Sequence, residues 1–166
     1  MNRVKQFYIN LTDKMREEDY EYVKSILNDM EYSMFIKLLK SEQKHSVRVA
    51  KEVQNLIDYI VVDDFDIVKN RDLLIKASLL HDIGKSKTKV NIIDKSIIVI
   101  LNKLTKGKLK NINNRKIDCY YNHSDYSYEL LKDIEDNELL LIIIKNHHSN
   151  SDDKLVKFFQ SIDDNS

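Results

Sequence analysis

Apolar residues along this chain recur mainly every three or four positions, which places them on one face of an α-helix. The stretch SEQKHSVRVAKEVQNLIDYIV shows the pattern most clearly through Val49, Val53, Leu56 and Ile60. Ser41 at its start is expected to cap this helix. The same spacing predicts further helices over residues 12–27, 30–40, 72–85, 92–107, 124–134, 137–149 and 153–164.

Two polar stretches separate the predicted helices. Residues 61–70, VVDDFDIVKN, are interpreted as an acidic break, and residues 108–119 as a polar connection. Gly107 before this connection is expected to end the preceding helix as its C-cap. The run Leu139–Ile144 could alone form a buried strand, but its helical continuation into Lys145 favours a helix.

Composition favours an all-α protein. The 166 residues include no proline and only two glycines, so few positions interrupt a helix. Charged residues make up 33% of the chain, and leucine, isoleucine, lysine and glutamate are abundant. This length suits a single domain that can bury a sizeable core.

Charge and cysteine content restrict the partners and the compartment. Lys+Arg and Asp+Glu both total 27, so the formal net charge is zero, without the basic surplus typical of proteins that bind nucleic acid polymers. The single Cys119 excludes an intramolecular disulfide and is typical of a reducing compartment. The chain opens without a signal-peptide pattern, and its apolar runs are shorter than the ~20 residues of a membrane span. We therefore expect a soluble, cytoplasmic protein with no membrane partner.

All five histidines lie in line with the apolar faces of their own helices, although a scattered set would point in all directions. His45, for example, lies four residues before Val49, while His123 is expected to precede the helix at 124–134, in line with Leu131. Burying several imidazoles without partners costs several kcal/mol. A metal site removes that cost, because neutral imidazole is the commonest metal ligand. The candidate ligands are His45, His81, His123, His147 and His148.

Two aspartates complete this pattern. Asp82 directly follows His81, and consecutive helical residues point about 100° apart. Both can therefore reach one ion only where the helix ends, and Gly84 in a left-handed C-cap conformation is expected to end it. In the last helix, Asp163 continues the apolar spacing, whereas Asp164 falls on the polar face. Asp163 is therefore the predicted ligand.

The motifs KHSVRVA and LLHDIGK resemble those of the HD-domain metal-dependent phosphohydrolase superfamily. NHSDYSYELL and IKNHHSN are similar to the additional histidine motifs of its two-metal branch, which includes HD-GYP cyclic-dinucleotide phosphodiesterases and related bacterial nucleotide phosphohydrolases. SNSDDK stands in place of the GYP motif, so the chain is more similar to compact HDIG-type proteins that act on other nucleotides. The resemblance implies an HD-type helical bundle over residues 41–166, with residues 1–40 as an appended helical segment packed on the core.

The resemblance also implies two divalent transition-metal ions. One ion would be held by His45, His81, Asp82 and Asp163, and the other by Asp82, His123, His147 and His148. A bridging Asp82 agrees with its chemistry, because a carboxylate has two oxygens and can join ions ~3.5–4 Å apart. Nitrogen and oxygen ligands without thiolate suit Mn, Fe, Co, Ni or Zn and do not choose among them. Fe or Mn is the first expectation.

The implied reaction is the attack of a hydroxide shared by two ions on a phosphoester or phosphoanhydride of a linear, cyclic or mononucleotide substrate. Lys85 is expected to act as a catalytic residue that stabilises negative charge on the transferring group, and Arg48 to bind a substrate phosphate. Spacing alone fits equally well a Lys85 that faces solvent and complements the helix dipole. Tyr120, Tyr121 and Tyr126, beside His123, are weaker candidates for stacking on a base, and packing in the core or at the surface is the commoner role for such residues.

Alternative functions use the same residues differently. A metal-containing nucleotide sensor with little turnover would need the same ligands. A single-metal nucleotidase would leave three inward histidines without a role, and a purely structural helical protein would leave the whole cluster unexplained. The sequence therefore favours a metal-dependent phosphohydrolase, and it leaves the substrate and the oligomeric state open.

Overall fold

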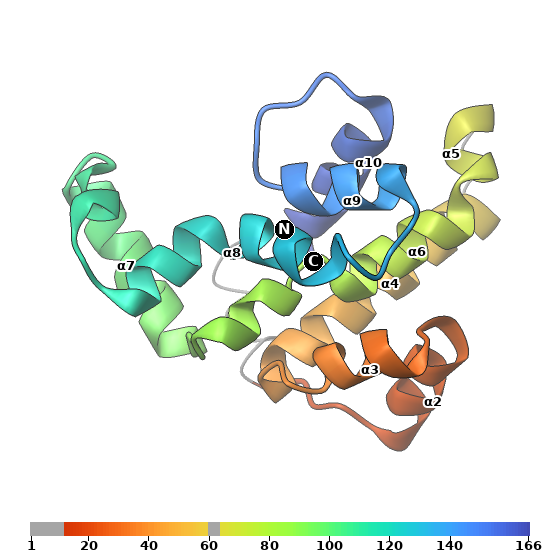
Figure 1. Cartoon of the computed structure of the whole chain (residues 1–166), viewed down its shortest axis with the longest axis horizontal. Helices are drawn as coiled ribbons and strands as arrows, with labels where there is room; N and C mark the ends of the chain where they lie inside the picture. The colour runs from red at the N-terminus through yellow and green to blue at the C-terminus, as the bar shows by residue number, and fades with distance from the viewer. Residues whose placement is uncertain (1–11, 60–63) are drawn as a thin grey trace.

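The computed structural model describes residues 12–59 and 64–166, and its regular elements in these ranges are all helices (Figure 1). The all-α fold predicted from composition and periodicity is confirmed. Within the same ranges, no helix has both the length and the apolar run that crossing a bilayer requires. The elements are α2 (Glu17–Ile26), α3 (Asp29–Phe35), α4 (Lys40–Tyr59), α5 (Phe65–Lys69), α6 (Arg71–Leu80), η1 (Ile83–Lys87), α7 (Ile92–Leu104), η2 (Lys108–Asn111), α8 (Arg115–Leu131), α9 (Glu138–Asn146) and α10 (Lys154–Asp163), where η marks a 3-10 helix.

Short polar side chains set the beginnings of six helices by accepting hydrogen bonds from backbone N–H groups of the first turn. The predicted Ser41 cap is wrong, because α4 already begins at Lys40 and Ser41 lies inside its first turn. The capping residues are Asn28, Asp64, Asn91, Asn114, Asn137 and Asp153.

Both predicted breaks contain helix, because their polar residues cap helices and do not only interrupt them. In the acidic break predicted at 61–70, Phe65–Lys69 form α5 behind the Asp64 cap, and residues 61–63 lie outside the described residues. The polar connection at 108–119 contains η2 and the first turn of α8, which the Asn114 cap begins. As a result, His123 lies inside α8 and does not precede a helix. The choice of helix over strand for Leu139–Ile144 is confirmed by α9.

The end of α7 differs slightly from the prediction. Thr105 is the C-cap, and the next two residues, Lys106 and Gly107, both have positive φ. The Gly107 N–H donates to the carbonyl of Asn102, five residues earlier, which satisfies one of the last helical carbonyls. Gly107 thus terminates the helix from two positions beyond the cap.

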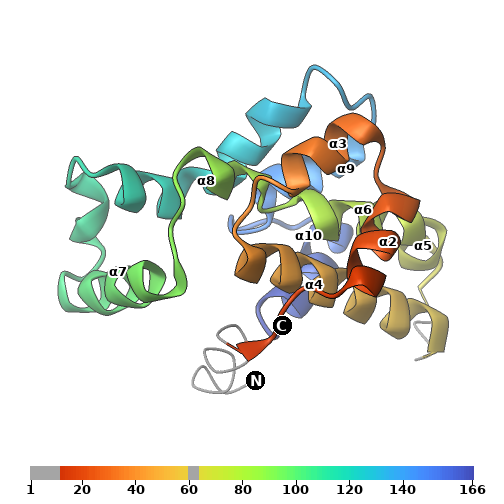
Figure 2. The ribbon, with the colours of Figure 1, turned by 90° about the horizontal axis from the view of Figure 1, so that it is seen from below.

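The core is organised around α4 and α6, which pack side by side beneath α9 and α10 (Figures 1 and 2). Val23 of α2 and Phe35 of α3 are fully buried in the same apolar cluster, so the N-terminal helices share this core. The division of the chain at residue 40 stays a prediction. Fully buried members from the central helices are Val47, Val49, Ala50, Val53, Leu74, Leu79, Leu80, Ile143, Ile144 and Phe159.

Helix α7 and η2 extend to one side of this body and join it through α8 (Figure 2). A separate small apolar cluster holds them to α8. It consists of Val90, Ile98, Leu109 and Cys119. Most of the remaining surface of α7 does not face the main core.

A buried ion cluster fastens the N-terminal helices to α4. The carboxylate of Asp19 in α2 is fully buried and lies 2.7 Å from Nζ of Lys44 and 2.8 Å from Nζ of Lys51. Burial alone would raise the pKa of Asp19, but the hydrogen bonds from both lysines lower it to about 2. The folded state therefore favours the ionised carboxylate.

The Asp19→Asn variant should lose about 2 kcal/mol of unfolding free energy at pH 7, because one pKa unit corresponds to about 1.4 kcal/mol. The folded-state pKa is below the unfolded value of about 3.9, so this stabilisation is present above about pH 4 and disappears as the pH falls toward about 2. Urea unfolding of both proteins between pH 2 and 7 measures the difference. Glu21→Gln, at an exposed position of α2, is the control and should change little. A difference that did not depend on pH would contradict the electrostatic assignment.

Candidate metal centre

The fold brings all seven predicted ligand residues to one place near the ends of several helices. Ring centroids of His81 and His147 lie 5.0 Å apart, and those of His45 and His81 lie 5.6 Å apart. The residues are His45 from α4, His81 and Asp82 from the end of α6, His123 from α8, His147 and His148 from the end of α9, and Asp163 from the end of α10. Three overlapping groups among them have ligand atoms within 4.8 Å of one another.

The chain changes from α-helix to 3-10 helix between His81 and Asp82. His81 is the C-cap of α6, and Asp82 is the residue before η1. This change of direction lets two consecutive side chains face one site, as the sequence predicts. The predicted cause is wrong, however, because Gly84 lies within η1 and has no positive φ.

Gly84 is instead required by a close approach between two backbones. A Cβ atom at this position would lie 2.1 Å from the carbonyl oxygen of His123 and 2.6 Å from the backbone nitrogen of Ser127. Only a residue without a side chain allows η1 to lie this close to α8. The glycine thereby sets the separation between Asp82 and His123.

Ser127 fixes the same contact through hydrogen bonds, and it is not among the residues predicted from the sequence. Its hydroxyl accepts from the Gly84 N–H at 2.9 Å and lies 2.6 Å from the carbonyl oxygen of His81, to which it donates. Ser127 lies four residues after His123, one helical turn away, and this spacing is the only signal that the sequence offers for it.

The two oxygens of Asp82 face opposite halves of the cluster. Oδ2 lies 3.2 Å from Nε2 of His81. Oδ1 lies 3.3 Å from Nε2 of His123 and 3.8 Å from Nε2 of His147. Asp82 is only 1% exposed, so these side chains surround its carboxylate in place of bulk solvent.

Asp163 belongs to the His81 half. Its Oδ1 lies 3.0 Å from Nε2 of His45 and 3.4 Å from Nε2 of His81. Asp163 is buried and Asp164 is exposed, as their positions relative to the apolar spacing predict. Two ligands that each lie ~2.1 Å from one ion are ~3.0–3.4 Å apart when the angle between them is roughly 90–109°. The distances around Asp163 match this range.

Backbone carbonyls orient three of the imidazole rings. In each case Nδ1 lies 2.6–2.9 Å from the carbonyl oxygen of the residue three positions earlier, which holds Nε2 toward the cluster. Metal-binding histidines are commonly oriented in this way by a second hydrogen bond. The pairs are His81 with Ser78, His123 with Tyr120, and His147 with Ile144.

The atoms that face inward lack hydrogen-bond partners. Buried nitrogens and oxygens without partners are costly, and clusters of them at ligand distances fit a bound cation. Among the described residues they include Oδ1 of Asp82 and Nε2 of His81, His123 and His147. The residues present therefore fit a site for divalent metal.

Electrostatics favour a cation in the same place. Burial alone would lower the pKa of His81, but the carboxylates of Asp82 and Asp163 raise it to about 10. Burial lowers the pKa of His45 and His123, so these imidazoles are neutral. His148 lies at the open side of the cluster. Partial desolvation and the neighbouring His147 and His123 lower its pKa to about 3.

Lys85 is enclosed beside the cluster and does not face solvent. Its Nζ lies 2.5 Å from Oδ2 of Asp82 and 2.8 Å from Oε2 of Glu42. Burial opposes the charge, but the two carboxylates raise the pKa of Lys85 above its ordinary value. Glu42 is not among the residues predicted from the sequence, although it lies three residues before His45 and therefore on the same face of α4.

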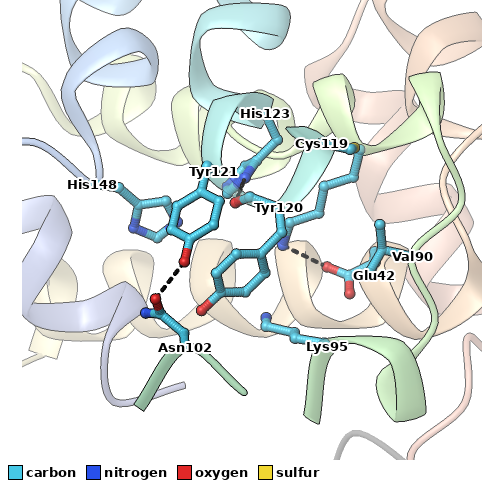
Figure 3. A pocket seen from close by; sticks show the side chains of 10 residues that line it. Glu42, Val90, Lys95, Asn102, Cys119, Tyr120, Tyr121, His123 and His148 are labelled. Atoms are coloured by element: carbon cyan, nitrogen blue, oxygen red, sulfur yellow. Dashed lines mark hydrogen bonds and ion pairs between the residues drawn. The ribbon is translucent and has the colours of Figure 1, made fainter. Parts of the chain in front are cut away.

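A pocket of about 340 Å³ opens next to these residues (Figure 3). Lys95 and Asn102 of α7 point toward Tyr120 and Tyr121 of α8, and the hydroxyl of Tyr121 donates to Oδ1 of Asn102. The volume falls within the range of small-molecule sites. The wall also contains Glu42, Lys85, Val90, Cys119, His123 and His148.

Arg48 is placed differently from the other predicted residues. It lies one turn after His45 on α4, where its guanidinium group lies 3.4 Å from a carboxylate oxygen of Asp13. Arg48 is not among the residues that line the pocket beside the cluster. Its role in binding substrate stays a prediction.

Histidines and carboxylates that project from facing helices at ligand spacing are typical of metal sites in helical proteins. The family model for the HD domain matches residues 43–164, so the chain belongs to the HD domain family, which consists mostly of metal-dependent hydrolases. The resemblance inferred from the motifs is confirmed at the level of this family. No curated protein and no solved structure gave a significant match.

Gly84→Ala should lose about 3 kcal/mol of unfolding free energy or more, because its Cβ would collide with rigid backbone of α8. Gly107→Ala is the matched control. Its Cβ would meet no atom within 4 Å, so only the left-handed φ of +84° costs energy, about 1–2 kcal/mol. Urea unfolding of the two variants measures the contrast. Equal losses would contradict a close contact of η1 with α8.

Proposed function

We propose that this protein is a phosphohydrolase that binds two divalent transition-metal ions and cleaves a phosphoester or phosphoanhydride bond of a nucleotide. The arrangement of Asp82 carries the proposal. Its Oδ2 faces His81, and its Oδ1 faces His123 and His147. A carboxylate whose two oxygens face different candidate ligand residues is suited to bridge two ions, one at each oxygen.

The remaining ligand residues divide into two groups around Asp82. His45, His81 and Asp163 form one group of neighbouring ligand atoms, and His123, His147 and His148 form another. A third group, His81, Asp82 and His147, joins the two. The donor atoms are nitrogen and oxygen, which suits Fe or Mn and also Co, Ni or Zn. Cys119 adds no thiolate, because burial raises the pKa of its thiol and its S–H donates to the carbonyl oxygen of Thr88 at 3.4 Å.

When bound, divalent ions supply Lewis acidity toward a phosphoryl group and lower the pKa of water to near neutrality. The chain contributes the other elements of the reaction. Buried carbonyl contacts hold the imidazoles in place, and the helices around Asp82 exclude bulk water. Preorganised groups of this kind avoid reorganisation during the reaction.

Lys85 would provide a fixed positive charge in the wall of the pocket. Asp82 and Glu42 hold its ammonium group in place, so its position is set before substrate enters. Negative charge that develops on a transferring phosphoryl group would be stabilised by this cation. Glu42 would act as a positioning residue, because it contacts Lys85 and not the ligand cluster.

The pocket beside the cluster supports a nucleotide as substrate. Lys95 offers a second cation within the wall, and Tyr120 and Tyr121 offer aromatic rings near His123 and His148 (Figure 3). Aromatic faces of this kind stack on bases at a typical gain of about 1–3 kcal/mol per base. A small-molecule substrate also agrees with the limited volume of the pocket.

Metal analysis tests the two-ion assignment. The purified protein, without a histidine tag, should contain about two transition-metal ions per chain. Asp82→Ala should remove both ions and all hydrolysis of a nucleotide panel, because both groups of ligands depend on it. His123→Ala should remove about one ion, because it changes one group only.

Asp164→Ala is the control for both variants, since Asp164 is exposed beside the ligand Asp163. It should retain both ions and full activity. Metal bound at the wild-type level in Asp82→Ala, with the fold verified by circular dichroism, would refute the bridging role. Two ions and nucleotide binding in the wild type, without turnover of any nucleotide tested, would favour the sensor alternative.

Lys85→Met should lower kcat by about 100-fold, a typical loss for one preorganised group that stabilises transition-state charge. It should leave both ions in place, because Lys85 is not a ligand. Lys89→Met, at an exposed position four residues further on, is the control and should retain activity. A kcat within about twofold of the wild type would contradict a role for Lys85 in catalysis.

A further inference from the structure

Helix α7 exposes a continuous apolar stripe. Five of its aliphatic side chains share one face, because they recur at three- and four-residue spacing. Their exposed fractions are 63% for Ile93, 50% for Ile97, 59% for Ile100, 40% for Leu101 and 73% for Leu104. Single exposed aliphatic residues are common on protein surfaces, but contiguous apolar patches mark interaction sites.

The opposite face of α7 has a different task. Lys95 and Asn102 line the pocket beside the metal centre. Leu104 lies nine positions after Lys95. At about 100° per residue, these two side chains leave the helix in nearly opposite directions. The apolar stripe therefore belongs neither to the pocket nor to the packing of α7 on α8.

Positive charge surrounds this stripe. Residues 88–117, here called the basic arm, contain eight Lys and Arg residues and one Asp, a net charge of +7. The whole chain is neutral, so the rest of the chain carries −7. Within the described residues, Lys116 is engaged by Asp94 at 2.7 Å. Exposed lysines near the stripe and its ends are Lys89, Lys103, Lys106, Lys108 and Lys110.

We propose that the basic arm docks on an anionic lipid bilayer, with the apolar stripe of α7 lying in the headgroup region. An amphipathic helix with aliphatic residues on one face and lysines around it binds such surfaces by apolar burial and electrostatic attraction together. Each basic residue near an anionic leaflet adds to this attraction. The sequence prediction of no membrane partner rested on the lack of a spanning segment, and surface docking needs none.

Charge argues against a second copy of the chain as the occupant. A symmetric contact through α7 would place two arms of +7 against each other, and like charges at such an interface oppose association. The arm projects from the body of the molecule (Figure 2), and the five side chains of the stripe are 40–73% exposed. An anionic bilayer can make both kinds of contact. Its headgroups attract the lysines, and its acyl boundary can bury the aliphatic stripe.

Vesicle flotation of the full chain tests this proposal. The protein should float with vesicles of equal phosphatidylcholine and phosphatidylglycerol and should remain unbound with phosphatidylcholine alone. Ile97→Gln with Leu104→Gln should weaken binding by about tenfold or more, because the stripe loses apolar area. Lys103→Gln with Lys110→Gln should weaken it by a similar factor and reduce its dependence on salt.

Two matched double variants serve as controls. Met30→Gln with Phe65→Gln removes exposed apolar residues of α3 and α5, and Lys14→Gln with Lys37→Gln removes exposed lysines outside the arm. Both should float like the wild type. All variants should keep the wild-type metal content, so failure of the docking proposal is distinguishable from failure of the proposed function.

Several outcomes would overturn the proposal. The proposal is wrong if the folded wild-type protein does not float with anionic vesicles. It is also wrong if the protein binds neutral vesicles equally well. Sedimentation in solution gives the third test. A dimer that dissociated on substitution of Ile97 and Leu104, without any vesicle binding, would assign the stripe to self-association.

Discussion

The burial of one carboxylate, Asp82, is the constraint on which the rest of the structure depends. A carboxylate removed from water is very unfavourable unless positive charge or hydrogen bonds compensate it. Here the compensation comes from several directions, with histidines near both oxygens and the Lys85 ammonium beside one of them. The helices that end or pass at this point therefore assemble around a negative centre. The need to compensate this buried negative charge accounts both for the packing of these helices and for the capacity of the site to bind cations.

Geometry at this centre relies on a single backbone contact. Asp82 comes from the turn between α6 and η1, while His123 comes from the middle of α8. Gly84 and Ser127 hold these two segments together, through a close approach and a hydrogen bond respectively. Neither residue is a candidate metal ligand. Even so, the distance between the two halves of the site depends on them.

Much of this arrangement follows from periodicity in the sequence. The five histidines and Asp163 could be predicted to converge because each continues an apolar stripe, and an error of several residues in the start of α8 did not move His123 off that stripe. Glu42 and Ser127 could not be predicted as neighbours of the cluster. Their partners Lys85 and Gly84 each lie 43 residues away in the chain, and only tertiary packing defines such contacts. The predicted helix boundaries were wrong where Asp64 and Asn114 cap helices. Aspartate and asparagine also occur in turns and loops, so their presence alone does not tell a cap from a break. The role of the seven residues as ligands stays a prediction.

Helix α7 has one face in the pocket and another in solvent, and it contacts the body mainly through α8. A helix with these two faces is a single rigid element shared by two surfaces. If an occupant of the outer face shifts its position, the distance between Lys95 and the tyrosines of α8 changes with it. Thermodynamic linkage then requires the reverse effect, so that a ligand in the pocket would change affinity at the outer face by the same factor. The arm thus offers a route by which the surroundings of the protein could set the occupancy of its site.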